Sequence, residues 1–220
     1  MIFRIKEDEE VLSFPDPRFG DEDGLFAVGG DLSIDRLILA YANGIFPWYD
    51  FREAEEILWW CPMKRFVIFP DKIHISHSMR TLLNKERYSC SVNQRFDDVI
   101  RQCSQLRINE KGAWLGEDMI RAYTELNRQG FAFSVEVWDE ETCQLVGGLY
   151  GVDMGNVFIG ESMFSLVPSA SKIALIYLAY IMRKAGKGKI IDCQLETNHL
   201  RSMGGRYISY DEYMEIMNKE

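Results

Sequence analysis

The alternation of hydrophobic and polar positions is clearest in the second half of the chain. Three runs rich in β-branched and aromatic residues follow one another there, separated by short turns: Phe131–Trp138, Leu145–Val152 and Val157–Gly160. Short runs of this type, joined by tight turns, predict neighbouring antiparallel strands. We therefore expect a β-meander at the centre of the fold.

Apolar positions at helical spacing surround this meander in the sequence. They predict helices at Ser76–Lys85, 95–104, 117–129 and Ala170–Arg183. Further apolar runs predict strands at Arg65–Pro70, Tyr88–Val92 and Lys189–Gln194, and two short helices close the chain. Helices that flank a mixed, largely antiparallel sheet define the α+β class, which is the fold class that we predict.

The first 62 residues are patterned differently, because turn-forming residues punctuate them. A short helix is predicted from Ser33, a plausible N-cap, to Asn43, and the aromatic cluster Ile45–Tyr49 follows it. We therefore predict two domains: a small N-terminal α/β domain at residues 1–62 and a larger domain at residues 63–220.

The composition is that of a folded globular protein. Hydrophobic residues make up 47% of the 220 positions, which is enough for a sizeable core. No apolar run reaches the roughly 18 residues that a membrane-spanning helix requires. The first residues also lack the long apolar stretch of a signal peptide. We therefore expect a cytoplasmic protein without a membrane partner.

The cysteines and histidines do not indicate a metal centre. The five cysteines are scattered without a C-x-x-C pair, and the chain has only three histidines. This pattern predicts neither a disulfide framework nor a zinc site, so no metal is expected. Cys193 alternates with Asp192 and Gln194 in the predicted strand, so its side chain should point away from theirs.

The charge is unevenly distributed along the chain. The net charge is −9 at residues 1–62, +5 at residues 63–111 and −5 at residues 112–220, which together give the total of −9. The basic middle segment could receive a phosphate backbone while the acidic parts repel it elsewhere. The alternative is that these charged residues only lie on solvent-exposed helix faces.

Acidic residues inside apolar runs are the sharpest candidates for chemistry. Glu161 directly follows a predicted strand, and Asp192 lies in the last one, two residues before Gln194. An unpaired buried carboxylate is costly, so chains keep one mainly where it has partners or a task. Asp192 and Gln194 should leave the same strand face, as a pair that could handle a proton or orient a nucleophile. Glu161 could hold a ligand ammonium group or form a structural salt bridge.

Tryptophans offer a second kind of site. Trp59 and Trp60 are adjacent at the predicted domain junction, and Trp114 lies in a short apolar segment. They could serve as stacking platforms for a nucleobase or simply pack a hinge. The glycines of Gly147–Gly151 lack the Lys-Ser/Thr of a phosphate loop and suit a bulge or the close approach of a ligand instead.

An ordered set of short stretches resembles the leucyl/phenylalanyl-tRNA–protein transferase family across nearly the whole chain. The stretches are Gly29–Leu32, Gly44–Trp48, Leu58–Pro62, His74–Ser76, Ser134–Trp138, Val146–Val152, Gly160–Ser165, Ala170–Lys172 and Ile191–Gln194. The resemblance implies that the larger domain has the GNAT acyltransferase fold. It also implies transfer of Leu or Phe, less often Met, from aminoacyl-tRNA to proteins with N-terminal Lys or Arg. The product would be an N-end-rule degradation signal, and no cofactor is implied.

The resemblance also assigns roles to individual residues. Asp192 and Gln194 match the catalytic pair, in which the carboxylate polarises the amide that draws a proton from the attacking amine. The aminoacyl group would be held by Glu161, Met163, Leu149, Leu175 and Leu178, and the terminal adenosine would stack on Trp60, Trp114 and Phe158. The tRNA backbone would meet His77, Arg80, Lys85 and Arg87. We expect the enzyme to be a monomer.

Two other functions remain as alternatives. An acetyl-CoA-dependent N-acetyltransferase would share the fold, but it normally has an R/Q-x-x-G-x-G/A loop before a helix. Residues Ser165–Ala170 lack that loop. A non-catalytic tRNA-end binder would need the tryptophans and the basic residues but not Asp192 and Gln194.

Overall fold

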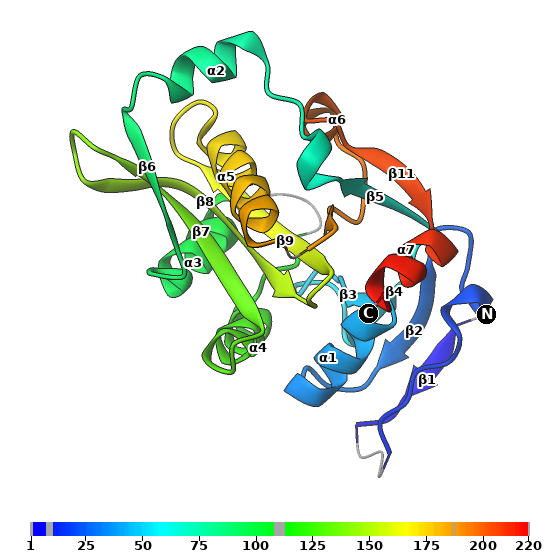
Figure 1. The fold of residues 1–220 in the computed structure, drawn as a ribbon. Helices are drawn as coiled ribbons and strands as arrows, with labels where there is room; N and C mark the ends of the chain where they lie inside the picture. The colour runs from blue at the N-terminus through cyan, green and yellow to red at the C-terminus, as the bar shows by residue number, and fades with distance from the viewer. Residues whose placement is uncertain (1, 8–10, 108–112, 187, 220) are drawn as a thin grey trace.

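A computed structural model describes residues 2–7, 11–107, 113–186 and 188–219 of the chain. Figure 1 shows two sheets, with the N-terminal strands at the lower right and the larger sheet behind helix α5. The larger sheet has seven strands and the smaller one has four.

The larger sheet has the strand order β11-β5-β10-β9-β8-β7-β6. In that order the strands are Arg206–Ser209, Lys64–Ile68, Ile190–Asp192, Val157–Ser165, Gln144–Asp153, Ala132–Asp139 and Tyr88–Val92. Neighbouring strands are antiparallel except β9 and β10, which run parallel. This mixed, largely antiparallel sheet confirms the predicted α+β class and the central meander.

Helices cover both faces of this sheet. The longest, α5, links β9 to β10 and packs on β7, β8 and β9, while α3 packs on the same three strands and α4 on β7. The helices are α1 (Ile34–Ala42), α2 (His77–Leu83), α3 (Phe96–Arg107), α4 (Glu117–Arg128), α5 (Ala170–Ala185), α6 (Asn198–Ser202) and α7 (Tyr210–Met217). Two short 3₁₀ turns, Pro17–Phe19 and Pro70–Lys72, complete the regular elements.

Adjacent glycines in β8 let helices approach the sheet from opposite sides. A Cβ built on Gly147 would lie 2.4 Å from the Cβ of Ala170 in α5, and one built on Gly148 would lie 3.3 Å from a methyl carbon of Val99 in α3. Because neighbouring residues of a strand face opposite sides, α5 and α3 cover opposite faces. The sequence suggested a bulge or the close approach of a ligand for these glycines, whereas Gly147 and Gly148 are approached by helices.

The N-terminal sheet has the order β1-β2-β4-β3, formed by Phe3–Ile5, Leu25–Gly29, Leu58–Trp60 and Phe46–Pro47. Helix α1 begins after Ser33 and ends at Ala42, as predicted. One apolar core contains side chains of both regions, including Leu37 and Trp59 beside Val99 and Tyr123. The division into domains after residue 62 therefore stays a prediction.

Three differences from the predicted elements matter for the site. Strand β9 continues to Ser165 instead of ending at Gly160, and β10 ends at Asp192 instead of reaching Gln194. Strand β11 was not predicted, because three of its four residues are exposed and give no hydrophobic alternation. The first two differences place Glu161 inside a strand and Gln194 outside one.

Candidate active site

A cavity of about 200 Å³ lies where β9 and β10 diverge. The two strands pair in parallel only up to Asp192 and Ile159, whereas β9 continues to Ser165. Because the strands separate there, side chains from β8, β9, α5, the end of β10 and the N-terminal strand β3 meet around one space. This divergence is the structural origin of the site.

The five residues predicted to hold the aminoacyl group all line this cavity. Leu149, Leu175 and Leu178 are buried, whereas Met163 and Glu161 are half-buried. An apolar protein cavity of about 150 Å³ already accommodates benzene, so this space has room for a Leu or Phe side chain. Among the described residues that line the cavity, Glu161 is the acidic one.

A β-bulge presents Glu161 to the cavity. In the β8–β9 pairing, Tyr150 lies opposite Ser162 and Gly151 lies opposite Gly160, so Glu161 is an extra residue in β9. Bulges interrupt the alternation of a strand and redirect the side chain at that point. The prediction that β9 ends before Glu161 was wrong, because this irregular pairing breaks the pattern without ending the strand.

A hydrogen-bonded pair of tyrosines from other elements contacts the Glu161 carboxylate through Tyr41. The Tyr41 hydroxyl of α1 donates to its Oε1 at 2.8 Å and shares a short hydrogen bond with the Tyr123 hydroxyl of α4. Burial raises the pKa of Glu161 to about 7, although hydrogen bonding by the tyrosine pair opposes that shift. Glu161 can therefore change its protonation state near neutral pH.

Asp192 and Gln194 do not leave the same face of a strand. Strand β10 ends at Asp192, and Gln194 has a left-handed φ of 54°. Gln194 lines the cavity, whereas the side chain of Asp192 is 0% exposed and does not line it. The Gln194 backbone N–H donates to Asp192 Oδ1 at 2.8 Å. The buried Asp192 carboxylate thus contacts the backbone of Gln194 without itself facing the cavity.

An arginine that the sequence analysis did not single out compensates Asp192. Arg65 of β5 donates to both carboxylate oxygens of Asp192, through Nε at 3.3 Å and through a short bond from Nη2. The side chains are 1% and 0% exposed, so this is a buried ion pair. A basic residue at the start of a predicted apolar strand was the signal that could have indicated it.

The predicted stacking aromatics separate into different places. Trp114 lines the cavity, whereas Trp60 does not, and Trp60 instead donates its indole N–H to the Trp48 carbonyl at 2.6 Å. Phe158 lines a second cavity of about 230 Å³, which shares the Leu178 side chain with the first.

Trp48 and Ser162 are among the lining residues that the sequence analysis did not assign to the site. Trp48 lines the cavity, and its ring packs edge-on against that of Trp60, with the ring centroids 5.5 Å apart. The aromatic cluster Ile45–Tyr49 was its only signal in the sequence. Ser162 also lines the cavity, and its buried hydroxyl has no hydrogen-bond partner in the described part of the chain.

Cys193 also lies in the cavity wall, beside Gln194. Cys193 was predicted to point away from both Asp192 and Gln194; it shares the cavity wall with Gln194 but not with Asp192, and the strand alternation behind the prediction ends at Asp192. Burial raises the pKa of the Cys193 thiol well above its usual range, which disfavours the nucleophilic thiolate. Among the described residues, no group of three His, Cys, Asp or Glu side chains could hold a metal ion.

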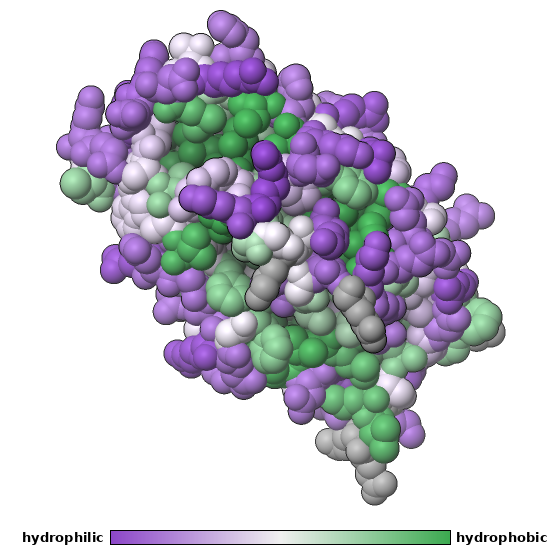
Figure 2. Space-filling view, viewed as in Figure 1, coloured by the Kyte–Doolittle hydropathy of each residue, from purple (hydrophilic) through white to green (hydrophobic). Residues whose placement is uncertain are grey.

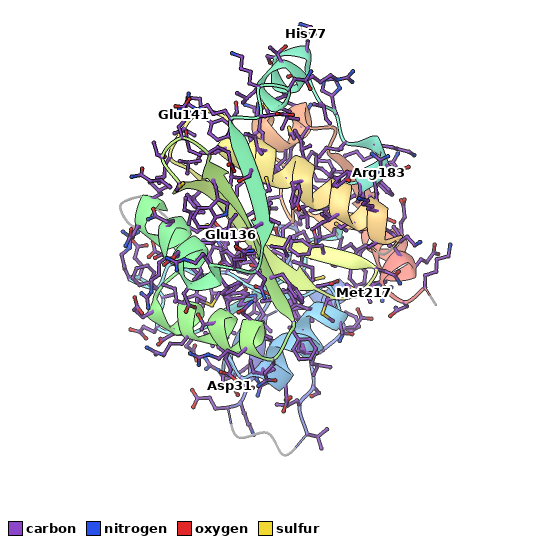
Figure 3. All side chains as sticks on the ribbon, turned by 60° about the vertical axis from the view of Figure 1, so that its left-hand side comes forward. Asp31, His77, Glu136, Glu141, Arg183 and Met217 are labelled. Atoms are coloured by element: carbon purple, nitrogen blue, oxygen red, sulfur yellow. The ribbon has the colours of Figure 1, made fainter. Side chains whose placement is uncertain are left out.

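The four predicted tRNA-contacting residues lie on α2 and the segment after it, and all are exposed. Figure 3 shows His77 on α2 at the edge of the molecule, pointing away from the sheet. Arg80 donates to the Ile75 carbonyl at 3.2 Å, whereas Arg87 forms an ion pair with Asp139 at 2.9 Å. Of the described residues that line the cavity, none comes from α2.

The surface below α2 is apolar rather than basic. Figure 2 shows hydrophobic side chains in a hollow under the polar helix, and residues such as Leu83, Tyr88 and Ile173 line the groove there. The basic side chains of α2 therefore border an apolar hollow. In the described part of the chain, no helix is both long and apolar enough to span a membrane.

Sequence comparisons match almost the whole chain to one family. Residues 67–218 match the sequence model of leucyl/phenylalanyl-tRNA protein transferase, and residues 30–63 match the model of that family's N-terminal domain. The protein named leucyl/phenylalanyl-tRNA–protein transferase from Flavobacterium johnsoniae is 50% identical over 210 residues, covering 95% of this chain and 97% of that protein. The protein of the same name from Pseudomonas fluorescens is 50% identical over 208 residues, covering 94% and 90%.

Solved structures are more distant. A probable acetyltransferase has 9% sequence identity and a TM-score of 0.40, over 53% of this chain and 85% of its own. The L-PGS protein from Bacillus licheniformis has 16% identity and a TM-score of 0.44, over 79% of this chain and 54% of its own.

Proposed function

The chain belongs to the leucyl/phenylalanyl-tRNA protein transferase family, and from this premise we propose which groups perform its reaction and which acceptors it takes. The enzyme transfers an aminoacyl group from aminoacyl-tRNA to a protein. We propose that the transferred residue is Leu or Phe, less often Met. We further propose that the acceptor is the α-amino group of a protein that begins with Lys or Arg.

One observation carries the assignment of the site. A single cavity brings together apolar walls, a carboxylate, two tryptophans and the Gln194 side chain. An aminoacyl ester presents an apolar side chain, an ammonium group, an adenosine and a carbonyl carbon, so each part meets a suitable group. Leu149, Met163 and Leu175 surround the side chain, and ionised Glu161 binds the ammonium.

The adenosine end stacks on the aromatic rings at the cavity wall. Trp48 and Trp114 both line the cavity, so we propose that these two rings hold the base. Trp60 supports Trp48 through its hydrogen bond and ring contact. Stacking on a tryptophan contributes about 1–3 kcal/mol per base.

Gln194 orients the attacking amine. The neutral acceptor nitrogen attacks the ester carbonyl carbon, its N–C bond forms, and the C–O bond to the tRNA ribose breaks. The Gln194 amide oxygen accepts a hydrogen bond from the amine and aligns its lone pair. Since an amide is a weak base, the proton does not stay there and ends on the ribose oxygen that leaves. Asp192 acts through the backbone of Gln194.

The wider role follows from the same chemistry. The ester bond of aminoacyl-tRNA is already activated, so the transfer needs no redox or acyl-carrier cofactor. The net charge of −9 favours approach of a cationic N-terminus. The basic residues of α2 contact the tRNA backbone, which makes binding weaken with salt. We propose that the new N-terminal residue marks the acceptor for degradation, and that the enzyme works as a cytoplasmic monomer.

The test is transfer of radiolabel from Phe-tRNA or Leu-tRNA to a peptide. Peptides with N-terminal Arg and Lys should become labelled, and a matched peptide with N-terminal Glu should not. Equal labelling of the Arg and Glu peptides would contradict the acceptor assignment. In parallel, Gln194→Ala should lose transfer while it keeps Phe-tRNA binding. A variant that transfers normally would remove Gln194 from the reaction.

A further inference from the structure

Arg65 stands out because its side chain is buried beside the site without lining the cavity. It is 1% exposed. Its guanidinium lies over two aromatic rings, at 5.0 Å from the centre of Phe46 and 4.8 Å from that of Tyr213. Burying a guanidinium is unfavourable unless every polar atom has a partner, so the contacts of Arg65 must be specific.

All three donor nitrogens of Arg65 have partners. Nε and Nη2 bind the two carboxylate oxygens of Asp192, and Nη1 donates to the Gly44 carbonyl at 2.5 Å. The partners are separated from Arg65 by 127 and 21 residues in the sequence. The planar fork of a guanidinium can satisfy these acceptors at once, whereas a lysine ammonium cannot hold the same geometry.

The contacts continue from Arg65 to the cavity wall. Asp192 Oδ1 accepts from both Arg65 Nε, at 3.3 Å, and the Gln194 backbone N–H, at 2.8 Å. Gln194 has the left-handed φ of 54°, which a residue other than glycine adopts only when its surroundings hold it there. The orientation of Asp192 therefore sets where the chain turns and where the Gln194 side chain enters the cavity.

We propose that Arg65 is a positioning residue for aminoacyl transfer, acting through Asp192 on Gln194. The Gly44 carbonyl and the two rings fix the guanidinium, and the guanidinium fixes the carboxylate that holds the Gln194 backbone. Arg65 itself exchanges no proton, because a guanidinium has no acceptor and keeps its charge. This inference rests on the proposed role of Gln194 in orienting the amine.

The chain provides a matched control for a purely structural role. Arg36 is also fully buried, pairs with Asp31 at 3.2 Å and donates to the Lys6 carbonyl at 3.0 Å. It contributes nothing to the described lining of the cavity. Arg65→Lys and Arg36→Lys therefore make the same chemical change to two buried guanidinium groups, although Asp31, unlike Asp192, is 34% exposed. Only the partner of Arg65 contacts the backbone of Gln194.

Both variants should be compared with wild type in three measurements: the single-turnover transfer rate at saturating Phe-tRNA, the Kd for Phe-tRNA, and the urea midpoint. Arg65→Lys should lower the rate by about 10- to 100-fold, because a displacement near 1 Å has effects of that size. Its Kd should stay within about 3-fold. Arg36→Lys should keep the rate per folded molecule within about 2-fold.

Equal rates for the two variants, or a loss in Kd alone, would overturn the proposal. If wild type transfers no Phe, the proposed function fails instead, so the two failures are distinguishable. If Arg65→Lys does not fold, Arg65→Gln is tested in an Asp192→Asn background, where no buried charge is left alone. If Arg65 acts only through Asp192, adding Arg65→Gln to Asp192→Asn should lower the transfer rate by no more than about a further 3-fold. A double variant whose loss equals the product of the two single-variant losses would contradict the inference.

Discussion

The two carboxylates at the divergence of β9 and β10 differ in what balances their charge. Asp192 is fully buried and paired with a guanidinium, whereas Glu161 borders the cavity and accepts from a tyrosine hydroxyl. A fixed cation compensates the first carboxylate at all times. The second has neutral hydrogen-bond partners among the described residues, and burial raises its pKa to about 7.

This difference separates two tasks that one residue type can perform. A carboxylate with a permanent counter-charge holds neighbouring groups in place, as Asp192 holds the backbone of Gln194. A carboxylate without one is available to a cationic ligand, as Glu161 is in the cavity. The environment, rather than the side chain, therefore decides which residue positions and which one binds.

Removing the compensated carboxylate should have the largest effect. Asp192→Asn leaves the Arg65 guanidinium buried without its counter-charge, so the free energy of unfolding should fall by about 3–5 kcal/mol. The transfer rate should fall as well, because the Gln194 backbone loses a charged acceptor. Urea unfolding measures the first effect, and peptide labelling measures the second.

A surface ion pair gives the control for this variant. Arg95 and Asp98 are half-exposed and pair at 2.6 Å. Asp98→Asn should therefore change the free energy of unfolding by less than about 1 kcal/mol. If Asp192→Asn changed stability no more than Asp98→Asn does, the buried pair would not hold the site, and the comparison of the two carboxylates would fail.

Changing the uncompensated carboxylate should alter pH dependence instead. The pKa of Glu161 is raised from 4.5 to about 7 in the folded protein. The folded state thus binds this proton more tightly, so the contribution of Glu161 to stability is greatest below pH 4.5 and falls as the pH rises to 7. The loss is on the order of 3 kcal/mol. Glu161→Gln should remove this loss between pH 4.5 and 7.

Urea unfolding of wild type and Glu161→Gln at several pH values tests this, because other titrating groups are common to both. Transfer should rise through pH 7 in wild type as Glu161 ionises and binds the ammonium. In Glu161→Gln the rate should be lower and the part of the rise due to Glu161 should disappear, which leaves only the rise from deprotonation of the acceptor α-amino group. Parallel stability curves for the two proteins would show that Glu161 titrates normally.

The comparison of these carboxylates also shows which features of the molecule could be predicted from the sequence. Long periodic segments predicted the meander and helices α1 to α5, because their patterns are local. The resemblance predicted seven residues that the structure brings to one cavity. Neither could give the bulge at Glu161 or the turn before Gln194, because both break the alternation that a strand prediction relies on.

The partners of the carboxylates were even less accessible from the sequence. Asp192 meets Arg65 across 127 residues, and Glu161 meets Tyr41 across 120. The sequence around each of these residues does not indicate which distant residue it will contact. Such pairs emerge from the order of strands in the sheet and from the shared core of the two regions. Local pattern therefore placed the acids but could not distinguish their roles.

The apolar wall of the cavity should determine which aminoacyl side chain is transferred, without changing how the two carboxylates act. Leu178 borders both cavities, so Leu178→Ala should enlarge the space for the transferred side chain. The ratio of kcat/KM for Phe-tRNA to that for Leu-tRNA should rise by about 10-fold, since a few methylenes are worth about 1–3 kcal/mol. The pH dependence set by Glu161 should stay as in wild type.

Leu126→Ala is the matched control, since Leu126 is fully buried in α4 and outside the described lining of both cavities. It should lower stability by about 2–5 kcal/mol, as core truncations do, without changing the Phe to Leu ratio. A Leu178→Ala enzyme with an unchanged ratio would place the transferred side chain elsewhere.

The smallest effect is expected at the surface. Two arginines, Arg80 of α2 and Arg87 after it, differ there in whether a carboxylate offsets their charge. Arg87 pairs with Asp139, whereas Arg80 donates to a backbone carbonyl. Arg80→Ala should weaken tRNA binding several-fold and reduce the slope of log K against log salt by about 0.7–0.9. Arg87→Ala should do less, because Asp139 already offsets its charge. Filter binding of tRNA across a salt series measures both slopes, and the reverse ranking would show that compensation does not predict which charges the tRNA uses.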